Sequence, residues 1–386
     1  MKIAYLGQKG IPAISGGIER HVEELATRMA ENGHEIFVYT RSHYTPTKLK
    51  TYKNVSLINL PSIFTKHLDA ITHTLFATFH SLFSHYDIIH YHGVGPALLS
   101  FIPRIFKPSA KVIVTFHCLD RKHEKWNWLA RTALKLGELA ACFFPHQTIV
   151  VSKNLQEYCL KNYKRETVYL PNGIEVGEKF SGSDKIKKLF KLEPKKYFLM
   201  VSRLIPHKNL EEAIKVFNRL PNLDYKLVIT GGGFFTDDYV EFLKKLASPN
   251  KNIIFTGIQQ GETLKQLYQN ALAFILPSKN EGLSLSLLEA LSFKLPTIVR
   301  SIPENREFIK KDLVLTFTNL KNLEEEILAI IKKPEVFAKI GIKACKFVKE
   351  YYSWSKIIQA TDLLYYKTVY GNNYLEFKNK RTSEVN

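Results

Sequence analysis

The sequence alternates short apolar runs with segments of helical periodicity, in two successive series. The first series of apolar runs comprises KIAYLG, HEIFVYT, YDIIHYHG, KVIVTFH, QTIVVS and TVYLPNG. The second comprises YFLMVSR, YKLVITGGG, NIIFTG, LAFILPS, PTIVRS and LVLTF. Such alternation is typical of βα units around parallel sheets. The sequence therefore predicts an α/β fold with two Rossmann-like, doubly wound domains that face a cleft.

The boundary between the two series lies near residues 171–173, a Pro-Asn-Gly turn signal followed by polar, lysine-rich chain. A length of 386 residues with 45% hydrophobic residues also favours two domains over one. After about Trp354, the pattern predicts one more amphipathic helix and then a frayed tail. We therefore expect an N-terminal domain over residues 1–172 and a C-terminal domain over 173–353, with the helix of residues 354–386 packing back on the first.

A formal net charge of +19 favours partners with phosphates or an anionic surface. One basic block interleaves cations with apolar side chains, which suits a lipid headgroup interface. The alternative is a solvated basic face with its aromatic residues in the core. The basic residues of this block are Arg104, Lys107, Lys111, Arg121, Lys122, Lys125, Arg131 and Lys135, and its apolar residues are Phe101, Ile105, Phe106, Trp126 and Trp128.

The four cysteines show neither metal-ligand spacing nor a disulfide framework, which fits a reducing compartment. The first residues are too short an apolar run for a signal peptide, and no run approaches the ~18 apolar residues of a membrane span. We expect a cytoplasmic protein, with any membrane contact peripheral and on the inner face.

In open α/β sheets, ligands bind beyond the carboxyl ends of the strands, so the residues that follow each apolar run are candidates for function. In the second series, Arg203 follows YFLMVS, and Lys208 stands at the expected start of the next helix. Gly231–Gly233 follow YKLVIT, and Glu281 follows LAFILPS. Taken singly, each is more often a surface charge or a turn. Their shared position predicts a binding site at one edge of the C-terminal domain.

The stretch NEGLSLSLLEAL predicts a helix whose first turn can bind an anion. Ser284 or Ser286 can cap this helix, and the backbone N–H groups of residues 283–286 would then form a phosphate site. Arg203 and Lys208 could neutralise a second phosphate, so the site suits a diphosphate held without a metal ion.

The two acids of this stretch have different predicted partners. Glu289 lies about a turn inside the helix, where its two oxygens could accept hydrogen bonds from both hydroxyls of a ribose. Glu281 precedes the helix and would face the group attached to the diphosphate. The alternative is that Glu281 is a loop acid favoured by the helix dipole and that Glu289 is a solvated helix acid.

In the first series, the loop GQKGIPAISGG lies between a strand and a helix and could bind phosphate or sugar, although it does not match G-x-G-x-x-G. His117 ends the strand KVIVTF and would point into the cleft; the alternative is a histidine bonded to nearby backbone. We interpret His21, His90, His92 and His146 as structural, because no metal-ligand spacing joins them. No Asp-x-Asp occurs, which counts against a metal-chelating nucleotide-sugar site.

Together these segments resemble the retaining glycosyltransferases of family 4, which have the GT-B fold and a glutamate-x7-glutamate motif. The resemblance spans nearly the whole chain and rests on GGIERHVEELATRMAENGHEIFVYT, TFHCLD, YLPNGIE, VSRLIPHKNLEEAI, FTG, and EGLSLSLLEAL with LPTIVRSIPENREFI. The local sequences SGGIERHVEELA and FHCLDRKHEKW are most similar to those of enzymes that build bacterial surface polysaccharides.

The resemblance implies a role for each candidate residue. Arg203 and Lys208 would hold the donor diphosphate, and Glu289 would bind the ribose. Glu281 would contact the transferred sugar, and His117 would lie beside its reacting face. The other implied donor-binding positions are Gly16, Gly17, Gly282, Leu283, Ser284 and Leu285. This chain departs from many relatives, which have glycine or aromatic residues in place of Leu283 and Ser284 and a glycine in place of Cys118.

The resemblance also implies the reaction. A sugar would pass from a nucleotide-diphosphate sugar to a hydroxyl of a saccharide or lipid-linked saccharide, with retained anomeric configuration, without a metal or other cofactor and without nucleic acid. Two alternatives stay open at this point. One is a GT-B-like epimerase acting on the same donors. The other is an NADP-dependent oxidoreductase with Arg41 facing a 2′-phosphate, against which the missing G-x-G-x-x-G counts.

Overall fold

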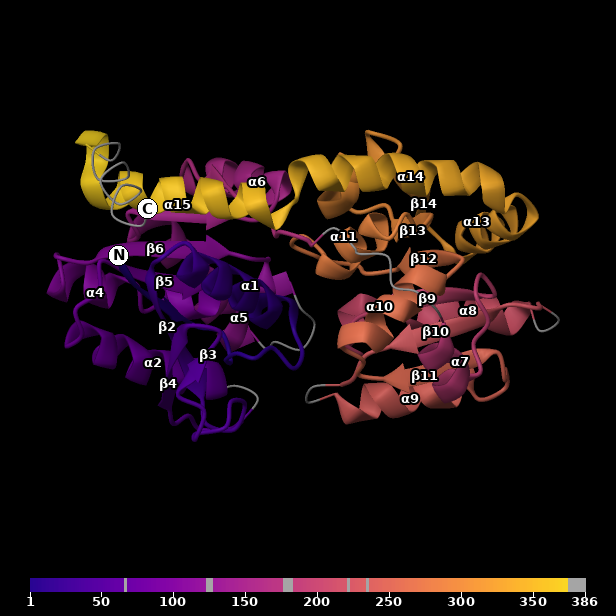
Figure 1. Ribbon diagram of the computed structural model, residues 1–386, viewed down its shortest axis with the longest axis horizontal. Helices are drawn as coiled ribbons and strands as arrows, with labels where there is room; N and C mark the ends of the chain where they lie inside the picture. Colours follow the sequence, from indigo (N-terminus) through magenta and orange to yellow (C-terminus); the bar gives the residue numbers. More distant parts are fainter. Residues whose placement is uncertain (66–67, 123–127, 176–182, 221–222, 234–235, 374–386) are drawn as a thin grey trace. The chain divides into compact units, whose positions relative to one another are not determined.

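The computed structural model describes residues 1–65, 68–122, 128–175, 183–220, 223–233 and 236–373. The chain divides into two compact units (Figure 1). The first unit contains Met1–Asn172 together with the chain from Trp354 onward, and the second contains Gly173–Ser353. Both units are parallel α/β structures, which confirms the predicted fold class. The predicted tail after the last helix lies outside the described residues from 374 onward.

In the described part of the chain, the sheet of the first unit has eight strands in the order β3-β4-β2-β1-β5-β6-β7-β8. Every pair is parallel except β3–β4, a hairpin that our reading of the apolar runs did not identify. Its turn residues Lys53 and Asn54 both have positive φ, the backbone conformation that such tight turns require. The strands are β1 (Lys2–Leu6), β2 (Glu35–Arg41), β3 (Thr51–Tyr52), β4 (Val55–Leu60), β5 (Ile88–His92), β6 (Lys111–Phe116), β7 (Gln147–Val150) and β8 (Val168–Tyr169).

Helices cover both faces of this sheet. Alternate strand residues pack against α1 (Gly17–Glu31) and α15 (Trp354–Tyr370) on one face, so the C-terminal helix belongs to this core. The residues between them pack on the other face against Ala77, Ala97 and Ala141. These three alanines lie in α2 (Asp69–Leu82), α3 (Val94–Ala97) and α5 (Trp128–Phe143). The remaining helices are α4 (Phe101–Phe106), α6 (Lys153–Tyr163), and two 3₁₀ helices, η1 (Asp120–Lys122) and η4 (Gly371–Asn373).

The sheet of the second unit has six parallel strands in the order β11-β10-β9-β12-β13-β14. The strand order reverses between β9 and β12, and such a reversal is the usual ligand position in sheets of this kind. The strands are β9 (Tyr197–Val201), β10 (Lys226–Thr230), β11 (Ile253–Gly257), β12 (Ala273–Leu276), β13 (Thr297–Arg300) and β14 (Leu315–Phe317).

The helices of the second unit also form two layers. One layer includes α10 (Gly261–Asn270), α11 (Leu285–Ser292) and α14 (Pro334–Tyr351), and the other includes α8 (Glu211–Arg219), α9 (Asp237–Ala247) and α13 (Leu320–Lys332). The remaining helices are α7 (Asp184–Phe190), α12 (Arg306–Ile309), η2 (Pro206–Lys208) and η3 (Pro303–Asn305).

Candidate functional site

The loops that follow β9 and β12 are joined by hydrogen bonds. The backbone N–H of Lys279 donates to the carbonyl of His207 at 2.9 Å. The buried Asn209 side chain donates to the carbonyl of Pro277 at 3.4 Å, and its backbone has a left-handed φ of 54°. Because β9 and β12 are neighbours in the sheet, these bonds hold the two loops together at the predicted edge.

The two loops bring a predicted cation and a predicted acid into contact. Lys208 Nζ lies 2.5 Å from Glu281 Oε1, with only 14% and 8% of the two side chains exposed. Lys208 lies in η2 and not at the start of the next helix, since α8 begins at Glu211. Arg203 differs, because its side chain has no hydrogen-bond or ion-pair partner among the residues that the structure describes. The edge therefore carries one neutralised and one unneutralised cation.

The predicted helix of the glutamate motif is α11. Ser284 is its N-cap: the Ser284 hydroxyl oxygen accepts a hydrogen bond from the N–H of Leu287 at 3.3 Å. Ser286 is not the cap and lies instead 3.0 Å from Ser284, hydroxyl to hydroxyl. The N–H groups of Leu285 and Ser286 precede the first intrahelical bond, so this end of the helix has donors to offer an anion.

Glu289 is held by a residue that the sequence did not indicate. The Tyr268 hydroxyl, on α10, donates to Glu289 Oε2 at 2.8 Å. Burial raises the pKa of Tyr268 well above its ordinary value, and the charge of Glu289 raises it further. Tyr268 therefore stays protonated and donates to one of the two carboxylate oxygens. Nothing in the local sequence distinguishes Tyr268 from an ordinary apolar-face residue of a helix.

The glycine loop after β10 packs beside Arg203. Gly231 has a φ of +143°, and a Cβ added there would lie 1.8 Å from the carbonyl oxygen of Ser202. The carbonyl of Gly232 accepts a hydrogen bond from the N–H of Leu204 at 2.9 Å. Gly231 is therefore required for the close approach of this loop to the segment that contains Arg203.

In the first unit, the loop of residues 7–17 is fastened to α1. Gly16 is the N-cap of α1 with a φ of +107°, and Gly17 is exposed. Two acids of α1 accept hydrogen bonds from loop N–H groups, Glu19 at 3.3 Å and Glu23 at 2.6 Å. These bonds occupy donors that a phosphate-binding loop would present to its ligand.

The charge and hydrogen bonds of Arg41 are used inside the first unit. It is buried, lies 2.5 Å from Asp69 in an ion pair, and donates to the carbonyl of Gly7 at 3.3 Å. Its charge is therefore neutralised, and the idea that it faces a 2′-phosphate is wrong.

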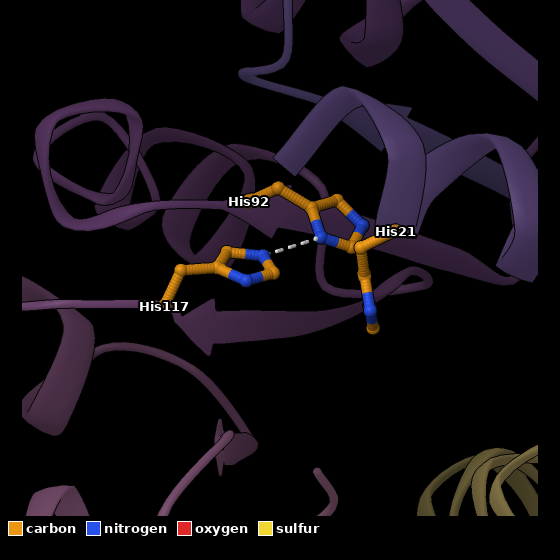
Figure 2. Close-up of side chains that lie close together, drawn as sticks. All are labelled: His21, His92 and His117. Atoms are coloured by element: carbon orange, nitrogen blue, oxygen red, sulfur yellow. Dashed lines mark hydrogen bonds between the residues drawn. The ribbon is translucent and has the colours of Figure 1, made fainter. Parts of the chain in front are cut away.

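His117 lies in a cluster of buried histidines (Figure 2). His117 Nε2 lies 3.2 Å from His92 Nδ1, and the rings of His117 and His21 meet edge to face with centroids 5.0 Å apart. The alternative of a histidine bonded to nearby backbone is therefore wrong for the Nε2 atom. Treating His21 and His92 as unrelated residues is also wrong. They come from α1 and from the end of β5, and only the fold brings them to the end of β6.

Burial keeps this cluster neutral. It lowers the pKa of His21 to about 4 and the pKa values of His92 and His117 well below their ordinary value. His92 Nε2 is buried and has no hydrogen-bond partner in the described part of the chain. A proton on His92 Nδ1, donated to His117 Nε2, avoids an unpaired buried N–H group. The neutral His117 then carries its own proton on Nδ1.

One outer face of the first unit combines apolar and basic side chains. Ile105, Phe106 and Trp128 are 60–73% exposed, so the alternative that the apolar residues of the basic block lie in the core is wrong for these three. Of the other members, Phe101 is half-buried, and Lys122, Lys125 and Trp126 lie outside the residues whose side chains are described. A shallow cavity lined by Arg121, Arg131, Thr132 and Lys135 adjoins the first turns of α5.

Helix α2 extends this face, which the sequence reading missed. It packs against α4 and shares the sheet face of α5. Its exposed apolar residues recur at helical spacing, a signal that was available in the sequence. They are Ile71, Leu75, Phe76 and Phe79, with Leu68 and Phe83 at the two ends of the helix. Within the ranges described above, no helix is long and apolar enough to cross a membrane.

Two family models match the chain one after the other. The model described as Glycosyltransferase Family 4 matches residues 15–178, and the model described as Glycosyl transferases group 1 matches residues 183–347. The chain belongs to the family 4 glycosyltransferases. The predicted enzyme class is thereby confirmed, and retention of anomeric configuration fits this family.

Relatives of this glycosyltransferase extend over its length. An uncharacterized glycosyltransferase of Methanocaldococcus jannaschii is 27% identical over 406 residues, which cover 95% of this chain and 98% of that protein. The UDP-Gal:alpha-D-GlcNAc-diphosphoundecaprenol alpha-1,3-galactosyltransferase of Escherichia coli is 27% identical over 268 residues, 64% of this chain and 66% of that protein. The structure of Anabaena HepE in complex with UDP and glucose has the same fold, with a TM-score of 0.78, 16% identity and coverage of 94% and 99%.

Proposed function

We propose that this glycosyltransferase moves a sugar from a nucleotide-diphosphate sugar to a hydroxyl of a saccharide or lipid-linked saccharide, with retention, in polysaccharide or lipid-linked glycan synthesis. One observation carries the donor assignment: Arg203, the Lys208–Glu281 ion pair and the capped start of α11 occur at one edge of the second sheet. A cation without a partner among the described residues, a second cation and helix N–H donors suit a diphosphate.

Each part of the donor has a proposed partner in the second unit. The N–H groups at the start of α11 bind one phosphate, and Arg203 binds the other. Glu289, oriented by Tyr268, accepts hydrogen bonds from the ribose. Glu281, restrained by Lys208, contacts the transferred sugar. The UDP and glucose bound to HepE and the UDP-galactose donor named for the E. coli relative support a nucleotide-sugar donor here.

The proposed chemistry needs no metal ion. Charge develops on the departing diphosphate, where Arg203, Lys208 and the helix N–H groups stabilise it. The same diphosphate helps to accept the proton of the attacking hydroxyl, on the front face of the sugar. His117, a neutral imidazole with its proton on Nδ1, donates a hydrogen bond to the transferred sugar.

The acceptor is proposed to be presented at an anionic membrane surface. The exposed apolar residues of α2, α4 and α5 and the basic cavity beside α5 suit lipid headgroups and phosphates. The diphosphoundecaprenol acceptor named for the E. coli relative supports a lipid-linked saccharide.

A donor-hydrolysis panel tests the function, because slow hydrolysis needs no known acceptor. UDP-, GDP-, ADP- and TDP-sugars are incubated with the enzyme in EDTA, and free sugar and nucleotide are measured. We expect release from donors of one nucleotide, undiminished by EDTA. An altered sugar nucleotide without release would indicate the epimerase, and a strict requirement for magnesium or manganese would contradict the proposed site.

A further inference from the structure

The three histidines of Figure 2 have the composition and spacing of a metal site. One nitrogen from each of His21, His92 and His117 lies within 4.8 Å of the other two. Among the described residues, no other group of three histidine, cysteine or acidic side chains has its ligand atoms this close together. We propose that these histidines bind a divalent transition metal ion, with Zn²⁺ as the expected ion.

The distances within the cluster favour this coordination. Zinc binds histidine nitrogen at about 2.0–2.1 Å in tetrahedral geometry, which places neighbouring ligand atoms about 3.3 Å apart. His92 Nδ1 and His117 Nε2 are already 3.2 Å apart. His21, whose ring is edge-on to His117, completes the site by a change in side-chain torsion. Three histidines and an open fourth position for water form a known type of zinc site.

The burial of the cluster also suits a metal ion. Metal binding requires neutral imidazole nitrogens, and His21, His92 and His117 are all buried. His21 Nδ1 is buried without a hydrogen-bond partner in the described chain, so a metal ion would satisfy it. A metal ion on His92 Nδ1 moves the proton of that ring to Nε2. An all-nitrogen ligand set favours zinc, copper or nickel over magnesium, which prefers oxygen.

Neighbouring residues hold the cluster in place. His90 stacks on His92, and both of its nitrogens are engaged, one by Tyr365 and one by Thr115, each at 2.7 Å. His90 therefore supports the cluster and is not a ligand. Trp354 packs near His21, with ring centroids 5.7 Å apart. Ligands fixed in this way lose little conformational entropy on binding a metal ion.

Metal binding would inhibit the enzyme and not assist it. A metal ion on His117 Nε2 places a positive charge beside the transferred sugar, whose reacting carbon becomes positive as the diphosphate departs. The inference is independent of the proposed function, because metal binding is measured without donor or acceptor. Loss of donor hydrolysis on adding Zn²⁺, reversed by EDTA, is the expected consequence.

The test uses the full chain, stripped of metal with EDTA and titrated with Zn²⁺ against a chromophoric chelator. We expect one tight site. His21→Gln and His92→Gln should each weaken it by more than the roughly 10–100-fold that is typical for losing a group that only supports a ligand. His85→Gln, which removes an exposed histidine, is the matched control and should leave affinity unchanged. Mg²⁺ should not compete.

A second measurement needs no variant. Co²⁺ added to the metal-free parent should give the intense visible absorption of tetrahedral cobalt, and Zn²⁺ should displace it. Absence of this spectrum, or equal Zn²⁺ affinity in the parent, His21→Gln and His92→Gln proteins, would overturn the proposal. If a variant does not fold, the cobalt spectrum of the parent still shows whether the metal site exists.

Discussion

The two units of this glycosyltransferase place their candidate residues in opposite electrostatic settings. In the second unit, the side chains at the edge after β9 and β12 are charged. Lys208 and Glu281 form an ion pair, and Arg203 has no partner in the described chain. In the first unit, His21, His92 and His117 are buried and neutral. The first arrangement suits an anionic ligand, and the second suits hydrogen bonds to neutral groups or a metal ion.

The difference follows from position in the fold. The cations and the acid lie beyond the ends of the strands. There the ion pair between Lys208 and Glu281 reduces the cost of two buried charges, and Arg203 is partly exposed to water. The histidines lie at the ends of β5 and β6 and in α1, packed against each other, where desolvation penalises the charged form. The same distinction predicts which substitutions act on binding and turnover and which act on stability.

Removal of the Arg203 side chain should have the largest effect on turnover. Arg203→Ala should reduce turnover by ~10²-fold or more, because the leaving diphosphate loses charge stabilisation. Lys208→Ala should act in the same direction and also leaves Glu281 without its partner. Arg219→Ala, an exposed arginine on α8, is the matched control for donor hydrolysis. Turnover of Arg203→Ala equal to that of the control would remove Arg203 from the site.

A charge reversal in the first unit should separate membrane binding from catalysis. Replacing the exposed Arg104, Arg131 and Lys135 with Glu should abolish co-sedimentation with anionic vesicles, because each basic residue near such a surface contributes about 1 kcal/mol. Donor hydrolysis should persist. The parent should bind anionic but not zwitterionic vesicles and be released by moderate salt.

The control for this experiment makes the same change of charge in the second unit. It replaces three exposed lysines with Glu: Lys187, Lys188 and Lys215. We expect this variant to sediment with anionic vesicles as the parent does. Equal loss in both variants, or parent binding indifferent to lipid charge, would indicate that the α2, α4 and α5 face has no specific role.

Substitution of Glu289 and of Glu281 should affect two different quantities, nucleotide affinity and turnover. Glu289→Gln should weaken binding of free nucleotide diphosphate by about 1–3 kcal/mol, the value of a charged hydrogen bond. Glu281→Gln should mainly lower turnover. Calorimetric titration of nucleotide and single-turnover rates measure the two effects. Similar losses of nucleotide affinity in both variants would show that the division is wrong.

Acid should destabilise the first unit through its neutral histidines. Their folded pKa values lie below the unfolded value of about 6.5, so the stabilisation is complete above pH 6.5 and is lost as the pH falls. For His21 the loss extends to about pH 4. Each such histidine contributes a slope of about 1.4 kcal/mol per pH unit in this range. Urea unfolding at several pH values should give a shallower slope for His21→Gln than for the parent or His85→Gln. An unchanged slope would contradict this.

The smallest effect is expected at the α11 cap. Ser284→Ala should lower the free energy of unfolding by ~1 kcal/mol, because the N–H of Leu287 loses its acceptor. Ser286→Ala is the control, since Ser286 makes no cap bond. Denaturant unfolding followed by circular dichroism compares them. An equal cost in the two variants would mean that the cap contributes nothing specific.

Local patterns in the sequence predicted most of the fold and the second-unit edge. The period of the apolar runs predicted strands from β1 to β14, apart from the β3–β4 hairpin. β3 has only two residues, which give no periodic signal, and β4, VSLINL, was missed although it has six. Residues that follow strands directly, such as Arg203 and Glu281, could be placed at a sheet edge because parallel strands end there. The choice between Ser284 and Ser286 as cap could not be made, since both are good capping residues.

By itself, the sequence determined the α/β class, the helix and strand segments and the acids and cations at strand ends, because these depend on periodicity and on neighbours along the chain. Only the tertiary structure decided which side chains meet. Tyr268 and Glu289, Arg41 and Asp69, and the histidines of α1, β5 and β6 are far apart in sequence. Their contacts, their burial and therefore their charge states depend on the crossover connections that fold these segments together.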